Sequence, residues 1–122
     1  DIRYPIFLFE IKTDFIISKS LVEHTPISRF PEVRRDIAII VDQKITAKDV
    51  RSCINSAADD SLQNLKLFDV YQGKGIDPNR KSLALGLTFT HSSRTLTDDE
   101  INHSMDSIVS SLEAQLGASL RN

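Results

Sequence analysis

A stretch near the middle of the chain, between residues 81 and 89, constrains the fold more than any other. Every second side chain in it is large and apolar: Leu83, Leu85, Leu87 and Phe89. The side chains between them are small: Ser82, Ala84, Gly86 and Thr88. Because successive side chains of a strand point to opposite faces of a sheet, this alternation predicts a strand with one core face and one nearly bare face.

A second strand-like run, at residues 67–71, precedes this strand across a loop rich in glycine, proline and asparagine. The two runs predict a β-hairpin with a long loop. Cross-strand partners share a face, so the hydrophobic pattern also determines the register. On the core face, the expected partners are Phe68 with Leu85 and Val70 with Leu83, which leaves Leu67 on the bare face.

The same register predicts what the bare face carries. It sets Tyr71 beside Ser82 and Asp69 beside Ala84. The bare face therefore holds one aromatic ring, one hydroxyl and one carboxylate among small side chains. Such a surface admits a flat ligand, and an unpaired nucleotide base is one.

Length and composition are those of an ordinary packed domain. The chain has 122 residues, of which 40% are hydrophobic, which suits one compact domain with a short appendage. The net charge of −2 argues against binding of a polyanion through bulk electrostatics. A single cysteine, Cys53, excludes an internal disulfide framework and fits a reducing compartment. Since no apolar run has the length of a membrane helix, we expect a cytoplasmic protein with no membrane partner.

The start of the chain differs from the rest, and we predict two parts. Residues 1–25 are expected to be the tail of a preceding core domain together with a linker, and residues 26–122 to be one domain. Within the tail, residues 7–11 are typical of a strand that belongs to a larger sheet, and residues 14–20 of a short turn or helix. Because the chain opens without a methionine, we expect it to be a piece of a longer protein.

The remaining segments predict two helices and two more strands. Residues 35–42 are apolar on both faces, which indicates a central strand. One helix is expected to begin at Thr46, where Asp49 completes a capping box, and a second at Thr97. Glu100 completes the second capping box, and Gly117 should end that helix. Residues 118–121 can supply a short final strand.

The resulting order is strand, helix, strand, strand, helix, strand. It is the order of the ferredoxin-like fold, an α+β βαββαβ sandwich. In this topology two helices cover one face of a four-stranded antiparallel sheet. The large side chains of residues 83–89 would then face the helices, and the face with Tyr71 and Ser82 would stay open.

Four motifs, in order along the chain, carry a resemblance to a known family. They are FPEVRRDIAIIVD at residues 30–42, LFDVYQGKGI at 67–76, KSLALGLTF at 81–89 and RTLTDDEI at 94–101. Together they resemble the ferredoxin-fold anticodon-binding domain at the C-terminus of the phenylalanyl-tRNA synthetase beta chain. The resemblance spans about residues 26–121, and the FLFEI segment at residues 7–11 is similar to the last strand of the domain before it.

The resemblance implies a function and its partners. The domain would bind the anticodon of phenylalanine tRNA and position this tRNA for aminoacylation by the alpha subunit. The parent ligase would be a hetero-tetramer of two alpha and two beta chains that uses ATP and magnesium. This fragment would itself hold no cofactor and catalyse nothing.

Seven residues are candidates for RNA binding. In the family, the tyrosine of LFDxYxG and the serine of KSLA contact the first anticodon base, and these are Tyr71 and Ser82 here. Asp69 and Ala84 lie beside them on the bare face. The cations expected to approach phosphate are Arg35, Arg80 and Lys81, with Arg34 and Arg94 as further cations of this kind. The chain departs from the family at Leu85, where an aromatic is common, and at Gly86, where a longer, often basic residue is common.

Three alternatives remain open at this point. An RNA-recognition motif shares the topology but stacks bases on aromatics of its first and third strands, where this chain has Ala38, Ile40, Ala84 and Gly86. A ferredoxin-like regulatory or dimerisation module would bind a small molecule or pair with a second copy. An acylphosphatase-type enzyme needs an anion-binding loop after the first strand, and residues 41–44 are too short and carry an acid. Neither a carboxylate dyad nor metal-ligand spacing is present, so no catalytic or metal site is predicted.

Overall fold

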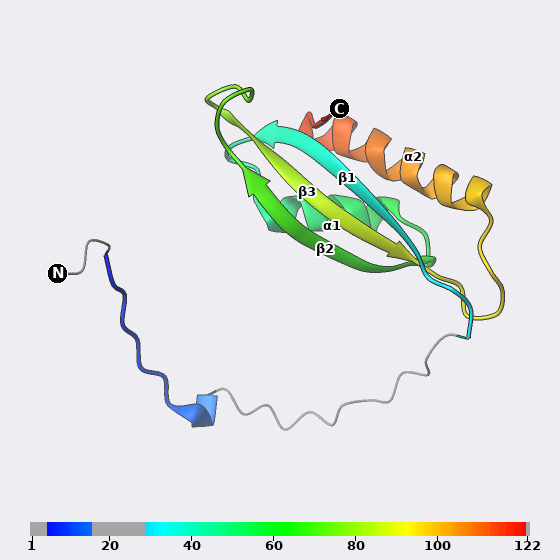
Figure 1. Ribbon diagram of the computed structural model, residues 1–122, viewed down its shortest axis with the longest axis horizontal. Helices are drawn as coiled ribbons and strands as arrows, with labels where there is room; N and C mark the ends of the chain where they lie inside the picture. Colours follow the sequence, from blue (N-terminus) through cyan, green and yellow to red (C-terminus); the bar gives the residue numbers. More distant parts are fainter. Residues whose placement is uncertain (1–4, 16–28, 122) are drawn as a thin grey trace.

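The computed structural model describes residues 5–15 and 29–121 (Figure 1). Its centre is a four-stranded antiparallel sheet in the order β2-β3-β1-β4, accompanied by two α-helices. The elements are a short 3₁₀ helix η1 (Thr13–Phe15), β1 (Val33–Asp42), α1 (Ala47–Ala57), β2 (Leu62–Tyr71), β3 (Arg80–Phe89), α2 (Asp98–Leu116) and β4 (Ser119–Leu120).

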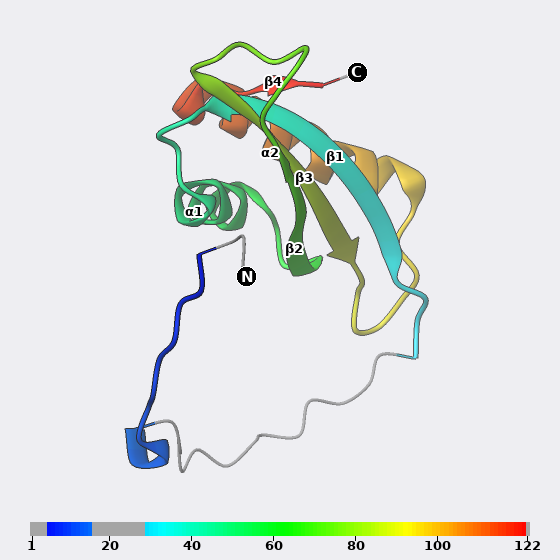
Figure 2. The same cartoon turned by 60° about the vertical axis from the view of Figure 1, so that its left-hand side comes forward.

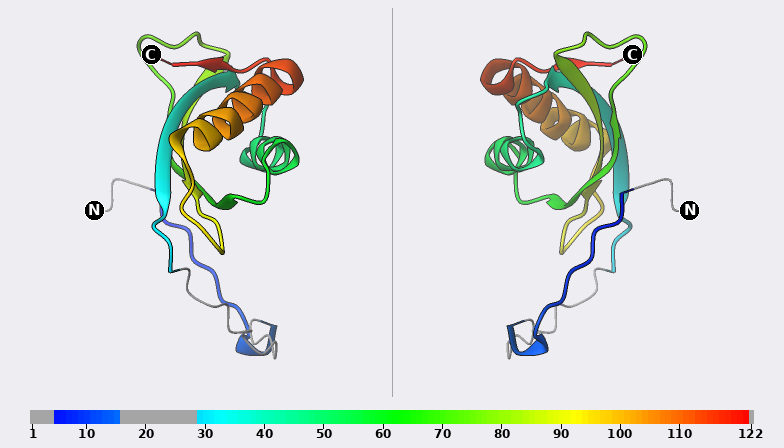
Figure 3. Two further views of the ribbon diagram at one scale, coloured as in Figure 1. Left: turned by 90° about the vertical axis from the view of Figure 1, so that its right-hand side faces the viewer. Right: turned by 90° about the vertical axis from the view of Figure 1, so that its left-hand side faces the viewer.

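Both helices lie on the same side of the sheet. Figure 2 shows α1 and α2 within the concave side of the curved strands, and Figure 3 shows the sheet edge-on with no described helix on its other side. This arrangement confirms the predicted α+β ferredoxin-like fold. We call the side without helices the open face; it carries the small side chains of β3.

The core fills the space between the sheet and the two helices. All four large side chains of the β3 alternation are buried, and Leu87 and Phe89 have no exposed surface. The side chains that meet them from β1 and the helices are Ile39, Val41, Val50, Cys53, Ile54, Ile101, Ile108 and Leu112. Because burying one such aliphatic or aromatic side chain stabilises a fold by ~1.5–3 kcal/mol, this layer holds the helices against the sheet.

Both helices begin at the predicted capping boxes. The Thr46 hydroxyl accepts a hydrogen bond from the backbone N–H of Asp49, and the Asp49 carboxylate accepts one from the backbone N–H of Thr46. Thr97 and Glu100 repeat this exchange at the start of α2. Gly117 ends α2 with a positive φ of 58°, the left-handed conformation that glycine adopts without a steric penalty.

The predicted register of the β2–β3 hairpin is confirmed for the residues next to the loop and is wrong beyond the bulge at Phe68. Asp69 pairs with Ala84, Val70 with Leu83 and Tyr71 with Ser82, as predicted. Leu67, however, pairs with Leu85, because a β-bulge at Phe68 adds one residue to β2. The bulge reverses the faces of these two side chains, so that Leu67 packs against the core and Phe68 does not. β2 also begins at Leu62, five residues before the predicted run.

The predicted strand at residues 7–11 is absent from the structure. Pro5 to Lys12 carry no strand, and Phe7, Leu8 and Phe9 are each more than four-fifths exposed. A strand exists only where a neighbour pairs with its backbone, and no described residue does so here. Of the predicted turn or helix at residues 14–20, η1 covers the beginning, and residues 16–20 lie outside the described part. The division at residue 25 also falls there and stays a prediction.

The capping box of α2 leads to a prediction about pH. Hydrogen bonds from Arg94, followed by those from the backbone and side chain of Thr97, lower the pKa of Glu100 to about 2. Since the folded pKa lies below the unfolded value of about 4.3, the stability that this carboxylate contributes is complete above that value and is lost as the pH falls towards 2. Glu100→Gln should therefore lower the melting temperature at pH 7, and the difference from wild type should shrink between about pH 4.5 and 2.

Thermal unfolding followed by circular dichroism at pH 7, 4 and 2.5 measures this difference. Glu113→Gln, an exposed substitution near the other end of the same helix, is the control and should change little at any pH. A constant difference for Glu100→Gln across the series would contradict a role for the ionised carboxylate.

Candidate nucleic-acid interface

The open face has four levels of side chains along β3. Each level takes one residue from β2, one from β3 and one from β1, which face each other across the paired strands. The levels are Tyr71, Ser82 and Ile40, then Asp69, Ala84 and Ala38, then Lys66, Gly86 and Asp36, then Asn64, Thr88 and Arg34. The first two levels contain the four bare-face residues that the sequence predicted as RNA contacts.

The ring of Tyr71 is held in place by the loop that follows it. Its hydroxyl donates a hydrogen bond to the carbonyl oxygen of Lys74 (3.1 Å). Gly73 lies so close that an added Cβ would come within 3.0 Å of the tyrosine oxygen, which explains why the loop has a glycine here. The side chain remains about one-third exposed, so a fixed aromatic ring is accessible at the end of β2.

Arg121, which the sequence analysis did not consider, covers both predicted base contacts. Its backbone N–H donates to the carbonyl of Ala38 (2.8 Å), which extends the pairing just beyond β4. Its guanidinium lies over the Tyr71 ring, 5.2 Å from the ring centroid, and donates to the hydroxyl of Ser82 (3.3 Å). Ser82 is consequently only 3% exposed although no helix covers it.

A second arginine lies over an aromatic ring at the other end of the open face. Arg34 extends from β1 so that its guanidinium lies over the Phe68 ring of β2, 5.6 Å from the centroid. Its Nε donates to the carboxylate of Asp36 (2.8 Å). An added Cβ at Gly86 would lie 3.0 Å from both the Arg34 Nη2 atom and an Asp36 oxygen. The arginine therefore occupies the position that a longer side chain at residue 86 would fill.

These two arrangements correct the expectation of a bare surface with one ring. The β-bulge adds a second ring, Phe68, and 47% of that side chain is exposed. Between the two arginines, Asp69 is exposed and Ala84 is half-buried. The open face thus offers two rings, two guanidinium groups and two carboxylates rather than one ring and one carboxylate.

Three of the cations predicted to approach phosphate, Arg35, Arg80 and Lys81, have partners within the chain. Arg35 forms an ion pair with Asp98 at the start of α2 (3.3 Å), on the helix side of the sheet. Arg80 donates to the carbonyl oxygens of Ile40 and Gly117, both at 2.9 Å. Lys81 donates to the carbonyl oxygen of Gln43 (3.0 Å). The structure does not gather these cations around Tyr71, and their RNA contacts remain predictions.

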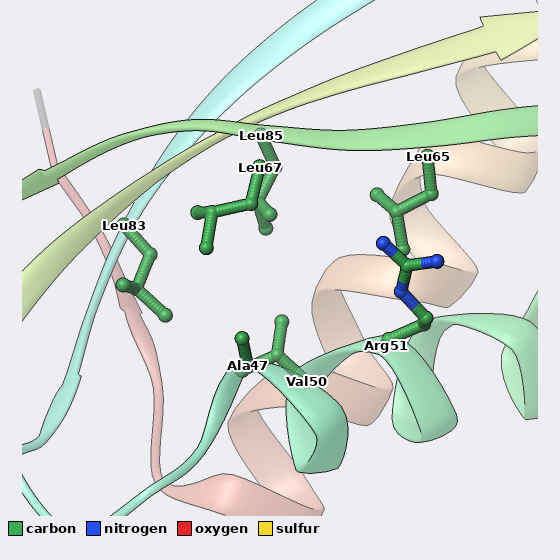
Figure 4. A pocket seen from close by; sticks show the side chains of 7 residues that line it. All are labelled: Ala47, Val50, Arg51, Leu65, Leu67, Leu83 and Leu85. Carbon is green, nitrogen blue, oxygen red and sulfur yellow. The ribbon is translucent and has the colours of Figure 1, made fainter. Parts of the chain in front are cut away.

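A small pocket on the helix side is a poor alternative site. Figure 4 shows it between α1 and the strands β2 and β3, where the side chains of Leu67, Leu83 and Leu85 point towards the helix. Its lining is apolar except for Arg51 at one end. Binding sites for small molecules combine an apolar wall with several converging polar groups, and this pocket lacks them.

Within the described ranges, other chemistries also lack a site. No group of three potential metal ligands occurs there, and no helix is long and apolar enough to cross a membrane. Burial raises the pKa of the Cys53 thiol and thus opposes formation of a nucleophilic thiolate. A larger, polar pocket lined by Asp59, His91, Arg94, Glu100 and His103 lies beside the start of α2. Tyr71 and Ser82, the predicted base contacts, pair on the open face instead, which is therefore the candidate site.

Comparison with known proteins places the chain in a family. The sequence model described as "Ferredoxin-fold anticodon binding domain" matches residues 28–121. The chain belongs to this family. The ferredoxin-fold anticodon-binding resemblance seen in its four motifs is thereby confirmed.

Relatives of the chain carry a more specific name. It is 50% identical over 117 residues, 96% of its length, to the "Phenylalanine--tRNA ligase beta subunit" of Pseudomonas fluorescens Pf-5. It is 42% identical over 114 residues to the same-named protein of Shewanella oneidensis and 43% identical over 121 residues to that of Pseudoalteromonas translucida. The matched region covers 14–15% of these relatives, so the chain spans a small part of their length.

The contact between Tyr71 and Arg121 leads to a second prediction. A cation–π contact at an exposed site is worth about 0.5–1 kcal/mol, and a double-mutant cycle isolates it from other effects. Unfolding free energies of wild type, Tyr71→Leu, Arg121→Met and the double variant should give a coupling of about this size. A cycle with Tyr71 and Lys81, which contacts Gln43 instead, should give a coupling near zero. Additive free energies in the first cycle would show that the two side chains do not interact in solution.

Proposed function

We propose that this chain is the anticodon-binding domain of a phenylalanine-tRNA ligase beta subunit. It would hold the anticodon loop of phenylalanine tRNA on the open face while the ligase attaches the amino acid elsewhere. The observation that carries this proposal is the pairing of Tyr71 with Ser82 on a face without helices, in a chain of the anticodon-binding family. The names of the matched relatives supply the identity of the tRNA.

The chemistry of the first level suits an unpaired base. The Tyr71 ring offers a π-face for stacking. A serine hydroxyl has one donor and two acceptor positions, so after accepting from Arg121 the hydrogen of Ser82 can go to a base acceptor. The exposed carboxylate of Asp69, one level along, can accept from a base N–H. A base bound here would meet a ring, a donor and an acceptor within one part of the face.

The entering base must share this space with Arg121. The guanidinium either moves away from the ring or stays and forms the other wall of the base site. Arginine stacks on bases as well as on aromatic side chains, so the second arrangement needs only a small displacement. In the unbound chain the base site is thus closed by Arg121, a side chain that can itself bind RNA.

The rest of the proposed ligase would supply what this chain lacks. The alpha subunit, in a tetramer of two alpha and two beta chains, would bind ATP and magnesium and perform aminoacylation. Residues 1–25 would connect this domain with a preceding one, in which the exposed apolar side chains of residues 6–11 would be covered. We further propose that the protein acts in the cytoplasm, where its tRNA is found.

Electrostatics should contribute little to binding by the chain alone. Its 15 basic and 17 acidic residues give a net charge of −2. Arg35, Arg80 and Lys81 would need to exchange their internal partners for phosphate oxygens. Weak binding of free tRNA with a shallow salt dependence is therefore expected, since few counterions are released. The alternative, a regulatory module that binds a small molecule, lacks the family match that supports the anticodon-binding reading.

Substitution of Tyr71 tests the proposal. Loss of a base-stacking contact costs about 1–3 kcal/mol, so Tyr71→Ala in the ligase should raise the KM for phenylalanine tRNA about five- to a hundredfold. Tyr71→Phe should be nearly silent if stacking dominates, and Ser82→Ala should be milder than Tyr71→Ala. Aminoacylation kinetics measure these effects, with thermal unfolding of each variant as the control for stability.

Two results would contradict the proposal. One is a sharp fall of the melting temperature in Tyr71→Ala with unchanged tRNA kinetics, which would make Tyr71 a packing residue. The other is a ligase that treats phenylalanine tRNA with altered anticodons like the natural one.

A further inference from the structure

The open face carries two arginine–aromatic pairs that are built in the same way. Arg121 lies over Tyr71 at the level of Ser82, and Arg34 lies over Phe68 at the level of Gly86. In both cases β2 provides the ring, β3 provides a small residue, and the arginine reaches the ring from the β1 and β4 side of the sheet. Only the first of these arrangements contains residues expected from the sequence as base contacts.

We propose that Arg34 and Phe68 form a second nucleotide-binding subsite, for another unpaired base of the RNA strand whose neighbour stacks on Tyr71. The inference rests on the proposed function and extends it to Phe68, which was not a predicted contact, and to Arg34, which was predicted only to approach phosphate. Its occupant is a base rather than a small molecule or a protein, because the subsite continues along the same strand face as Tyr71. Ser82 and Gly86 are four positions apart on β3, or about 13 Å, a distance that a few nucleotides of an unpaired loop can span.

The contacts of Arg34 determine which part of it is offered to RNA. Its Nε and Nη2 atoms face the two oxygens of Asp36, at 2.8 and 3.4 Å. This edge of the guanidinium, which could otherwise grip a phosphate, is therefore occupied and its charge is balanced. What remains for RNA is stacking on the planar group, which lies over the Phe68 ring and close to Gly86. A planar cation beside an aromatic ring is a stacking surface for a base.

Two further observations favour RNA over an unspecific contact. Phe68 keeps 47% of its side chain exposed, whereas its neighbour Leu67 packs against the core, so the bulge turns the ring outwards. Lys66 lies opposite Gly86 on the same face and is exposed, which places an ammonium group beside the subsite for a backbone phosphate. The two levels thus combine stacking surfaces with a nearby positive charge.

The test is binding of the full 122-residue chain to the anticodon stem-loop of phenylalanine tRNA. Phe68→Ala and Arg34→Met should each raise the Kd about five- to a hundredfold, as loss of one stacked base does. Gly86→Ala removes no contact group but brings a Cβ to 3.0 Å from the Arg34 guanidinium, so it should raise the Kd less than Arg34→Met does. Val70→Ala is the matched control, since Val70 is as exposed, lies on the same strand and faces the other way.

A second measurement identifies the bases. With 2-aminopurine placed singly at each loop position, stacking quenches its fluorescence on binding. With the Phe68→Ala variant, 2-aminopurine at one loop position should no longer be quenched on binding. With the Tyr71→Ala variant, the position that is no longer quenched should be a different one. A merely structural role of Phe68 would alter the melting temperature and all positions alike, and would overturn the inference.

The outcomes separate the inference from the proposed function. If Tyr71→Ala weakens binding while Phe68→Ala, Arg34→Met and Gly86→Ala bind like Val70→Ala, the second subsite does not exist and the anticodon site stands. If no open-face variant weakens binding, the proposed function itself fails. If Arg34→Met reduces the salt dependence of binding by about one phosphate contact without changing any quenching, Arg34 binds phosphate and the stacking subsite is wrong.

Discussion

The alternation of large and small side chains along β3 is the constraint on which both faces of the sheet depend. β3 pairs with β1 over its whole length and with β2 from Ser82 to Phe89, so the side chains of the alternation lie between two neighbouring strands. Its large side chains hold α1 and α2, and its small ones leave space for the guanidinium groups of Arg121 and Arg34. A Cβ at Gly86 would lie 3.0 Å from the second of these groups, so the alternation influences the open face as well as the core.

The parts of the structure that sequence reasoning could predict follow from local patterns. Capping boxes at Thr46 and Thr97, the glycine after α2 and the alternation on β3 each depend on residues a few positions apart, and each was found where expected. The pairing of Tyr71 with Ser82 was predictable because cross-strand partners share a face, and Val70 matches Leu83 in the hydrophobic pattern of the two strands. The bulge at Phe68 was not, because Leu67 and Phe68 are both apolar and a period of two fits either of them facing the core.

The charged residues show a different limit of sequence reasoning. A cation next to a strand can reach solvent, phosphate or the nearest carbonyl oxygen, and the sequence does not say which is closer. In the structure, Arg80 serves backbone carbonyls at the end of the sheet and Arg35 balances an acid at the start of α2. The role of Arg121 could not be predicted from the residues next to it in the sequence, because its contact with Tyr71 joins two segments that are fifty residues apart.

Under the proposed function, the arginines would let a weakly charged domain bind RNA with a small surface. In the unbound chain each ring already has a planar partner, and the Tyr71 hydroxyl is anchored on Lys74, so the rings lose little freedom when a base arrives. Binding to such a surface gains affinity because the side chains are already ordered in the folded chain and lose little conformational entropy, rather than because many new contacts form. It requires that the guanidinium groups stay on the sheet without a base, and the hydrogen bonds to Ser82 and Asp36 keep them there. The small residues of β3, the two rings of β2 and the two arginines therefore act as one preorganised surface, in which the loss of any member loosens the others.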